Sequence, residues 1–397
     1  MTITQSPSFS DRMKNIPESF IREILKVSSK PEMISFAGGL PNPNFFPVEK
    51  IAAAAESVLS KDGKSALQYW VTEGYLPLRD YIAQWQSKKM GMPISPEEIL
   101  ILNGSQQGLD MVGKLFLNPS SDVLLEGPSY LGAIQAFSVY QPCFHHIKIY
   151  EGGPDVGEFE STIKKIRPAL FYSVPNFQNP TGNTYDIYRR ESVAAIMRGS
   201  ETLWIEDNPY GEIYFEEQDL PDCYTLLPEK TIQLGSFSKI ISPGMRMGWA
   251  LGPIEVIKKM AIAKQASDLH SNNLTQRIIY QFLIDNALDD HLNAIRSFYK
   301  EQAEFMITAM KQYFPEGVTW IVPKGGMFIW VSLPEALDAT ILLKKAIANN
   351  VLFVPGENFY VGGEQGKNSF RMNFSNPSKE EITTGIKILG NLIREML

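Results

Sequence analysis

Short apolar runs alternate with helical patterns through the middle of the chain, and this alternation constrains the fold more than any other feature. Seven of the runs predict strands, at residues 99–103, 123–126, 146–150, 170–174, 203–206, 232–235 and 247–251. Helical patterns at 106–117 and 186–198 separate some of them. Such alternation is typical of a mostly parallel sheet with helices on both faces. Ligands bind at the carboxyl ends of parallel strands, so polar residues that follow a run are the candidates for function.

The N-terminal part of the chain has a different pattern. A polar arm at residues 2–10 precedes a segment at 17–27 in which apolar residues recur at helical spacing. The Gly- and Pro-rich stretch at 34–43 predicts an irregular loop. Helical stretches follow near 48–59 and 76–89.

The C-terminal part predicts a second, smaller unit. Its elements are a long helix near 287–314, strand-like runs within 318–331, 351–355 and 370–374, and a terminal helix from Lys379. We therefore expect an α/β protein whose large domain, residues 49–290, holds a mixed, mostly parallel, seven-stranded sheet flanked by helices. Residues 291–397 would form a small α+β domain, to which residues 1–48 add an arm and lid.

Charge and composition argue against several kinds of partner and site. The chain has 37 Lys and Arg against 44 Asp and Glu, a net charge of −7, and no basic run, so we expect neither nucleic acid nor an anionic membrane as partner. No stretch reaches the ~18 apolar residues of a membrane span. No signal peptide is recognisable, and the 2 cysteines form no C-x-x-C pair, which predicts a cytoplasmic protein. The histidines lack metal-ligand spacing, and adjacent His145 and His146 point to opposite faces of a strand, so no metal is expected.

Lys239 lies in the most distinctive local segment, just after the run 232–235. A lysine that forms an imine needs a lowered pKa, which burial or a neighbouring cation supplies. A phosphate-bearing aldehyde would provide the carbonyl group, and Arg246 could bind its phosphate with two hydrogen bonds, helped by Ser236 and Ser238. Taken alone the segment is a weak signal, because most lysines are solvated surface groups.

Asp207 and Asn179 also follow predicted strands. The carboxylate of Asp207 would face the site and could keep a pyridine nitrogen protonated. Its alternative role is to cap the turn at the following Asn-Pro. Asn179, before Pro180, is either a turn residue or a donor to the phenolic oxygen beside the aldehyde.

Two further segments connect a strand to a helix. In Asn103-Gly-Ser-Gln-Gln107 the free N–H groups of a helix N-terminus could bind phosphate. This feature alone is as weak as a single glycine-rich loop. Tyr130 follows the run 123–126 and could stack on a flat cofactor.

Together and in this order, these residues resemble the fold-type-I, pyridoxal-phosphate-dependent aminotransferases of class I/II, from about Ile34 to the C-terminus. The ordered matches are Tyr130, Asn179-Pro-Thr-Gly, Asp207 with Tyr210, Ser236 with Ser238 and Lys239, Arg246, and Arg371. The resemblance implies that Lys239 carries the internal aldimine with pyridoxal phosphate and then transfers the protons of the reaction.

The resemblance also implies roles for the other residues. Lys239, Asp207 and Tyr130 would be catalytic, with Asp207 on the pyridine nitrogen and Tyr130 stacked on the ring. The remaining cofactor-binding residues would be Asn179 and Tyr210 at the 3-hydroxyl, and Ser105, Gln106, Ser236, Ser238 and Arg246 at the phosphate. Arg371 would bind the substrate's α-carboxylate, with Asn179 and Gly39 nearby. Tyr69 would reach the phosphate of the neighbouring subunit, which implies a homodimer.

Within this family the chain resembles the 2-aminoadipate and kynurenine aminotransferases. The residues that carry this resemblance are the segment 34–47 and Phe20-Ile-Arg-Glu-Ile-Leu25 before it. Gly104-Ser-Gln-Gln-Gly-Leu109 and Pro128-Ser-Tyr130 with Ile134-Gln135 also match. Members accept acidic, aromatic and branched-chain L-amino acids, and 2-oxoglutarate is the expected acceptor. Arg22 would then meet the substrate's side chain from a mobile helix, or it would lie on a solvated helix face.

Two other functions use similar residues. A β-lyase or a decarboxylase runs on the same cofactor site, because the protein selects which bond breaks. A transcription regulator can carry the same kind of domain as an effector sensor, but it needs a DNA-binding module in front. The aminotransferase-like pattern begins within about the first 35 residues, which is too few for such a module.

Overall fold

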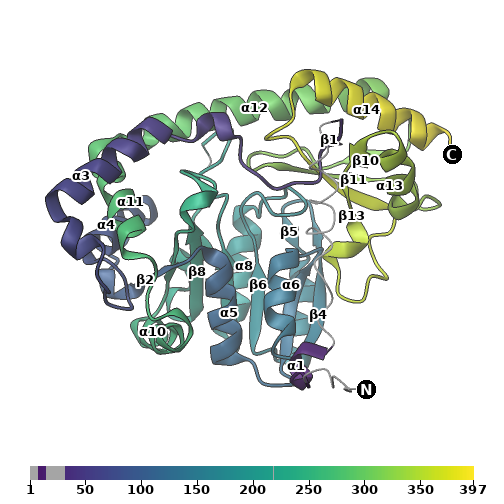
Figure 1. The fold of residues 1–397 in the computed structure, drawn as a ribbon. Coiled ribbons are helices and arrows are strands. Elements are labelled where there is room, and N and C mark those ends of the chain that lie inside the picture. Colours follow the sequence, from purple (N-terminus) through teal and green to yellow (C-terminus); the bar gives the residue numbers. More distant parts are fainter. Residues whose placement is uncertain (1–7, 15–31, 218) are drawn as a thin grey trace, which may run out of the picture.

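The large sheet forms the centre of the protein in a computed structural model that describes residues 8–14, 32–217 and 219–397 (Figure 1). The predicted helix at 17–27, with Arg22, lies outside these residues. The strand order is β2 (Ile99–Leu102), β9 (Gly248–Leu251), β8 (Thr231–Ser236), β7 (Leu203–Asp207), β6 (Leu170–Ser173), β3 (Asp122–Gly127), β4 (Cys143–Tyr150) and β5 (Gly153–Pro154). All seven predicted strands are present, and the sheet has an eighth, the two-residue β5.

The sheet is mixed, as expected. β4, β3, β6, β7 and β8 are parallel, whereas β9 is antiparallel to both β8 and β2. β5 is a short antiparallel addition to β4. The carboxyl ends of the parallel strands therefore meet at one edge of the sheet, where Asp207 and Ser236 are the last residues of β7 and β8.

Helices cover both faces of this sheet because side chains alternate along each strand. Leu124, Phe171 and Trp204 pack against α7 (Val156–Ile166) and α8 (Ile187–Arg198). The opposite face packs on α5 (Ser105–Phe116), α6 (Leu131–Ser138) and α10 (Ile254–Asp268). The other described α-helices that precede α12 in the sequence are α1 (Asp11–Lys14), α3 (Val48–Ala66), α4 (Leu76–Met90), α9 (Cys223–Leu226) and α11 (Asn273–Asp285).

A second, antiparallel sheet lies in the C-terminal part. Its order is β10 (Thr319–Trp320), β11 (Phe328–Ser332), β14 (Ser369–Asn373) and β13 (Val354–Pro355). Helices α13 (Ala339–Ala348) and α14 (Lys379–Arg394) accompany it. The 26-residue α12 (Leu288–Tyr313) runs from the side of α3 and α11 to α14, and so connects the two parts of the molecule (Figure 1).

The predicted loop at 34–43 contains one unexpected element. β1 (Ile34–Ser35) pairs in parallel with β12 (Val351–Leu352). A two-residue strand whose partner lies in the C-terminal part leaves no local pattern in the sequence. This pairing holds the following residues, which include Gly39, beside the second sheet.

The described ranges contain neither a membrane-spanning helix nor a metal-binding cluster. None of the helices in these ranges is both long and apolar enough to cross a membrane. Nor do three or more His, Cys, Asp or Glu side chains in the described part of the chain converge as ligands for a metal ion.

Candidate active site

A cavity of about 280 Å³ opens at the carboxyl edge of the large sheet, facing the second sheet. Nearly all of the candidate residues line it: Gly39, Ser105, Gln106, Tyr130, Asn179, Asp207, Tyr210, Ser236, Ser238, Lys239, Arg246 and Arg371. Tyr69 does not line it, and its side chain is 76% exposed. The structure thus brings all of the described candidate residues except Tyr69 together in one cavity.

Lys239 follows β8 in a tight turn and points into the cavity. Its Nζ donates a hydrogen bond to the Gly39 carbonyl at 2.7 Å. Burial, with the positive charges of Arg371 and Arg246, lowers the pKa of the Lys239 amine to about 8. An amine with such a pKa is neutral in an appreciable fraction at physiological pH, which both nucleophilic attack and proton abstraction require.

Asp207 is the last residue of β7, and only 2% of its surface is exposed. Its Oδ2 accepts a hydrogen bond from the Tyr172 hydroxyl at 2.8 Å, whereas its buried Oδ1 has no partner. Burial raises the pKa of this carboxyl to about 7, and the Tyr172 hydrogen bond opposes the rise. The Asp207 side chain therefore bonds to Tyr172 on the neighbouring strand β6 rather than to the Asn-Pro turn that follows Asp207. The free oxygen fits the protonated ring nitrogen of pyridoxal phosphate.

Arg371, on β14, brings the second sheet into the site. It is 1% exposed, and it donates to Asn179 Oδ1 at 2.7 Å and to the Ala37 carbonyl at 2.6 Å. Its guanidinium lies 4.3 Å from the centre of the Phe328 ring, and its Nε has no partner. Burial lowers the pKa of Arg371 to about 10, so the side chain remains a cation at neutral pH. A buried cation with a free donor fits a carboxylate.

Asn179 and Tyr210 lie together beside Arg371. The Asn179 amide donates to the Tyr210 hydroxyl at 3.4 Å. Because Asn179 Oδ1 is engaged by Arg371, its amide nitrogen is directed toward Tyr210 and the cavity. The pair thus offers the donors that a phenolic oxygen would need.

The N-terminus of α5 forms an anion-binding corner with Arg246. Gly104, which precedes the helix, has φ +83°, and a Cβ there would lie 3.0 Å from Arg246 Nη2. The first N–H groups of a helix have no intrahelical acceptor. Ser236 and Ser238 line the same cavity, so donors from three segments converge where a phosphate would bind.

Tyr130 is oriented by two residues that the sequence did not single out as a pair. Its hydroxyl donates to Gln106 Oε1 at 3.4 Å, and the Gln106 amide donates to the Gly132 carbonyl at 2.8 Å. A Cβ at Gly132 would lie 2.5 Å from the Tyr130 ring. The glycine two residues after Tyr130 was the only local signal of this close contact.

Glu126 is a further residue that sequence reasoning missed. This buried carboxylate accepts hydrogen bonds from the Tyr185 hydroxyl at 2.6 Å, the Gln178 amide at 2.6 Å and the Val174 N–H at 3.0 Å. It thereby fixes both ends of the loop that carries Asn179. Burial raises the pKa of Glu126 to about 7. Its signal in the sequence was an acidic residue at the end of an apolar strand.

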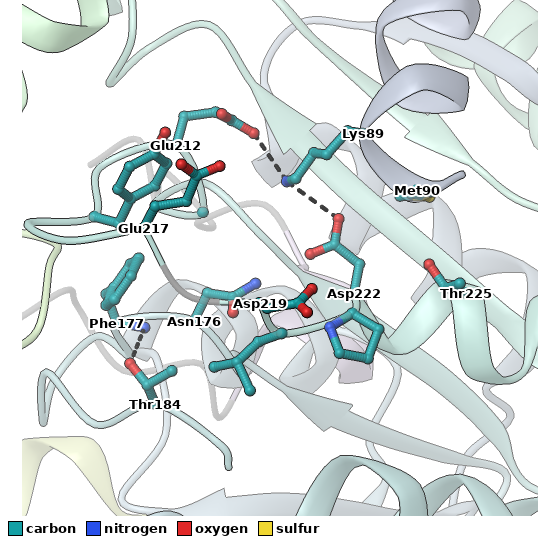
Figure 2. Close-up of a pocket in the computed structure, with 14 residues that line it drawn as sticks. Lys89, Met90, Asn176, Phe177, Thr184, Glu212, Glu217, Asp219, Asp222 and Thr225 are labelled. Carbon is teal, nitrogen blue, oxygen red and sulfur yellow. Dashed lines mark hydrogen bonds and ion pairs between the residues drawn. The ribbon is translucent and has the colours of Figure 1, made fainter. Parts of the chain in front are cut away.

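A second, larger cavity of about 650 Å³ lies away from these residues (Figure 2). Lys89 lines this cavity and forms ion pairs with Glu212 at 2.8 Å and with Asp222 at 3.1 Å. Burial opposes the charge on Lys89, but the two carboxylates outweigh it and raise the pKa of the amine. An amine held protonated in this way is a structural cation. None of the predicted site residues lines this cavity.

Comparison with known proteins agrees with the chemistry of the smaller cavity. The family described as aminotransferase class I and II matches residues 32–389. The 2-aminoadipate transaminase of Thermus thermophilus is 40% identical, over 100% of this chain and 98% of that protein. Aromatic-amino-acid aminotransferase 1 of Thermococcus litoralis is 38% identical, over 99% and 96%. The structure of Pyrococcus horikoshii kynurenine aminotransferase with PMP, kynurenine and its product superposes with a TM-score of 0.94 at 39% identity, covering 98% of this chain and 97% of that one.

Proposed function

Since the chain belongs to aminotransferase class I and II and is a pyridoxal-phosphate-dependent transaminase, we propose that it transfers the amino group of an acidic, aromatic or branched-chain L-amino acid to 2-oxoglutarate. The observation that carries this proposal is that Lys239 and Arg371 line the same cavity. One supplies an amine of lowered pKa, and the other a buried cation with a free Nε. A substrate that places its α-carbon at Lys239 can place its α-carboxylate on Arg371.

Each part of the cofactor has a matching group in the proposed site. When bound, pyridoxal phosphate supplies an aldehyde that bonds to amines and a protonated ring that accepts electrons. Lys239 would hold the aldehyde carbon, and Asp207 Oδ1 would hold the proton of the ring nitrogen. Asn179 and Tyr210 would donate to the phenolic oxygen, and Tyr130 would lie on the ring. The phosphate would bind Ser105, Gln106, Ser236, Ser238 and Arg246.

Lys239 would also move the proton of the reaction. The Gly39 carbonyl, 2.7 Å from Nζ, can hold the amine in place when it is free. From there the amine would take the proton from the substrate α-carbon and deliver it to the former aldehyde carbon of the cofactor, a 1,3-proton shift. Arg371, with Asn179 and Gly39 beside it, would orient that α-carbon toward the amine.

The proposed assembly is a homodimer in which Tyr69 reaches the partner's phosphate. The support is that Tyr69 and its chain neighbours Leu67 and Val71 are exposed apolar side chains, and that Leu67 and Tyr69 line one surface depression. Exposed apolar patches are typical of interfaces. The three-part division at residues 48/49 and 290/291 and the cytoplasmic location stay predictions. The unpaired Cys143 and Cys223 agree with a reducing compartment.

The direct test is a screen of amino donors with 2-oxoglutarate and pyruvate as acceptors. A transaminase forms a new amino acid from the acceptor in amounts equal to the 2-oxo acid formed from the donor. A β-lyase instead releases ammonia and pyruvate without an acceptor, and a decarboxylase releases CO₂. Acceptor-independent turnover as the main reaction would contradict the proposal.

Substrate recognition yields a prediction that compares Arg371→Ala with Arg22→Ala. Arg371→Ala should raise KM for every donor and acceptor at least about tenfold, because a charge-assisted pair in a closed site is worth roughly 2–5 kcal/mol. If Arg22 meets a side-chain carboxylate, Arg22→Ala should impair 2-aminoadipate and glutamate but spare leucine. Its effect on those donors should be smaller than the effect of Arg371→Ala. Steady-state kinetics with paired acidic and neutral donors measures both.

The exposed Arg394 at the end of α14 provides the control, and Arg394→Ala should leave all KM values unchanged. Equal losses for both donor classes in Arg22→Ala, or no loss, would mean that Arg22 does not recognise the side chain. A selective loss in Arg371→Ala would contradict its role at the α-carboxylate.

A further inference from the structure

An ion pair with a fully buried lysine lies behind the turn that leads into α5. Asp268, the last residue of α10, is 2.9 Å from Lys264 Nζ through each of its carboxylate oxygens. Its Oδ2 also accepts from the side-chain amides of Asn103 at 2.6 Å and Gln107 at 2.7 Å. The Lys264 side chain is 0% exposed. The Asp268 side chain is 26% exposed, so the defined geometry of the pair comes from its many hydrogen bonds.

Asn103 is held at its N–H, its carbonyl and its side-chain amide nitrogen, the first and the last of these through the ion pair and Gln107. The Asn103 N–H donates to Gln107 Oε1 at 2.9 Å, and that same oxygen accepts from Lys264 Nζ at 3.0 Å. The Asn103 carbonyl accepts from Arg246 Nη2 at 3.2 Å, and its side chain is held by Asp268. The next residue, Gly104, takes a left-handed φ of +83° that glycine adopts without strain. The path of the chain into α5 is therefore fixed from behind.

The charge of Lys264 matters for an anion on the other side of the turn. The Asp268 carboxylate alone would repel a phosphate at the N-terminus of α5. Lys264 neutralises it, and because the Lys264 side chain is fully buried, water screens its charge less than it would at the surface. Lys264 and Asp268 do not line the cavity. They can therefore affect the phosphate only through the position of the turn or through their electrostatic field.

We propose that Lys264, Asp268 and Gln107 are positioning residues for the cofactor's phosphate. They hold Asn103 and Gly104 so that the N–H groups at the start of α5 and the Arg246 guanidinium converge on one point. The inference rests on the proposed placement of the phosphate at Ser105, Gln106 and Arg246.

The test compares a ligand that has the phosphate with one that lacks it. Cofactor-free full-length protein is titrated with pyridoxal phosphate and with pyridoxal, and binding is followed by absorbance. Asp268→Asn and Gln107→Met should each raise the Kd of pyridoxal phosphate about tenfold, the equivalent of one charge-assisted hydrogen bond. The Kd of pyridoxal should stay within about twofold, because pyridoxal makes no phosphate contact. Equal weakening of both ligands, or no weakening, overturns the proposal.

The charge argument has its own pair of variants. Lys264→Met should weaken pyridoxal phosphate more than Asp268→Asn does, since it leaves the carboxylate without its cation. The double variant Lys264→Met/Asp268→Asn should bind more tightly than Lys264→Met alone, and no such recovery would contradict the argument. If Asp268→Asn does not fold, Gln107→Met carries the same comparison. Lys258→Met, on the same helix in an exposed pair with Glu255 at 2.8 Å, is the matched control and should change neither ligand.

Arg246→Ala separates failure of this inference from failure of the proposed site. If Arg246→Ala weakens pyridoxal phosphate selectively but Asp268→Asn and Gln107→Met do not, the phosphate is placed correctly and the positioning role is wrong. If Arg246→Ala also leaves the ratio of the two Kd values unchanged, the placement of the phosphate itself is wrong.

Discussion

Replacing Lys239 with alanine should lower the rate of transamination by at least about 10⁴-fold. The variant loses both the amine that holds the aldehyde and the group that moves the proton, and a positioned acid–base group alone contributes roughly 10²–10⁴-fold. Pyridoxal phosphate should still bind, because the phosphate and ring contacts remain. Single-turnover kinetics with a donor amino acid measures the rate, and equilibrium dialysis measures the retained cofactor.

Borohydride reduction gives this prediction a chemical control. In the parent protein the reduced pyridoxyl group should be recovered on Lys239 by peptide mapping, and Lys239→Ala should take up no label. Lys258→Ala, a change at an exposed lysine of α10, should alter neither rate nor labelling. Label on another lysine in the parent, or near-normal turnover of Lys239→Ala, would show that the reactive amine has been assigned wrongly.

The sequence predicted the large sheet well because most of its strands are apolar and helical patterns separate some of them. All seven predicted strands are confirmed. Six of them are buried almost throughout, which favours apolar residues on both faces, whereas β4 is only partly buried. β1 could not be predicted, because two residues carry no periodicity and their partner, β12, lies in the C-terminal part of the chain. β5 is equally short, and its Gly-Pro sequence reads as a turn.

The candidate site was predictable where a polar residue ends an apolar strand. Asp207 and Lys239 stand out in this way, and the structure places both in one cavity. Tyr172 could not be found, because a tyrosine inside a strand reads as core until its neighbour on the next strand is known. The same holds for Asp268, whose partners Asn103 and Gln107 come from a different helix and loop. Spatial pairs of this kind leave no spacing in the sequence.

The second large effect is expected for Asp207→Asn. The variant keeps an oxygen for the Tyr172 hydroxyl but cannot hold a proton on the ring nitrogen, so the ring accepts electrons poorly. Loss of one preorganised electrostatic group of this kind costs about 10²–10³-fold in rate. The rate should stay low at saturating pyridoxal phosphate, whereas Arg246→Ala should recover much of its activity there. If Asp207→Asn and Arg246→Ala recovered activity to the same extent at saturating pyridoxal phosphate, the separate roles given to Asp207 and Arg246 would be wrong.

The same substitution should have the opposite effect on the stability of the cofactor-free protein. Burial raises the pKa of Asp207 from 3.8 to about 7, so the folded state prefers the neutral carboxyl. The unfolded chain ionises first as pH rises, and the folded state therefore loses stability between about pH 4 and pH 7. An amide at this position does not ionise and escapes that loss.

Without cofactor, Asp207→Asn should therefore unfold at a higher temperature than the parent at pH 8, and the difference should shrink at pH 5. Thermal unfolding at the two pH values measures it, and titrating groups that do not interact with Asp207 cancel because both proteins contain them. A pH-independent difference would mean that Asp207 is not held neutral in the folded protein. A lower unfolding temperature at pH 8 would mean that its ionised form is stabilised. We expect Asp207 to destabilise the cofactor-free protein at pH 8, because ionising a buried carboxyl with an unpartnered oxygen costs free energy until a cation binds it.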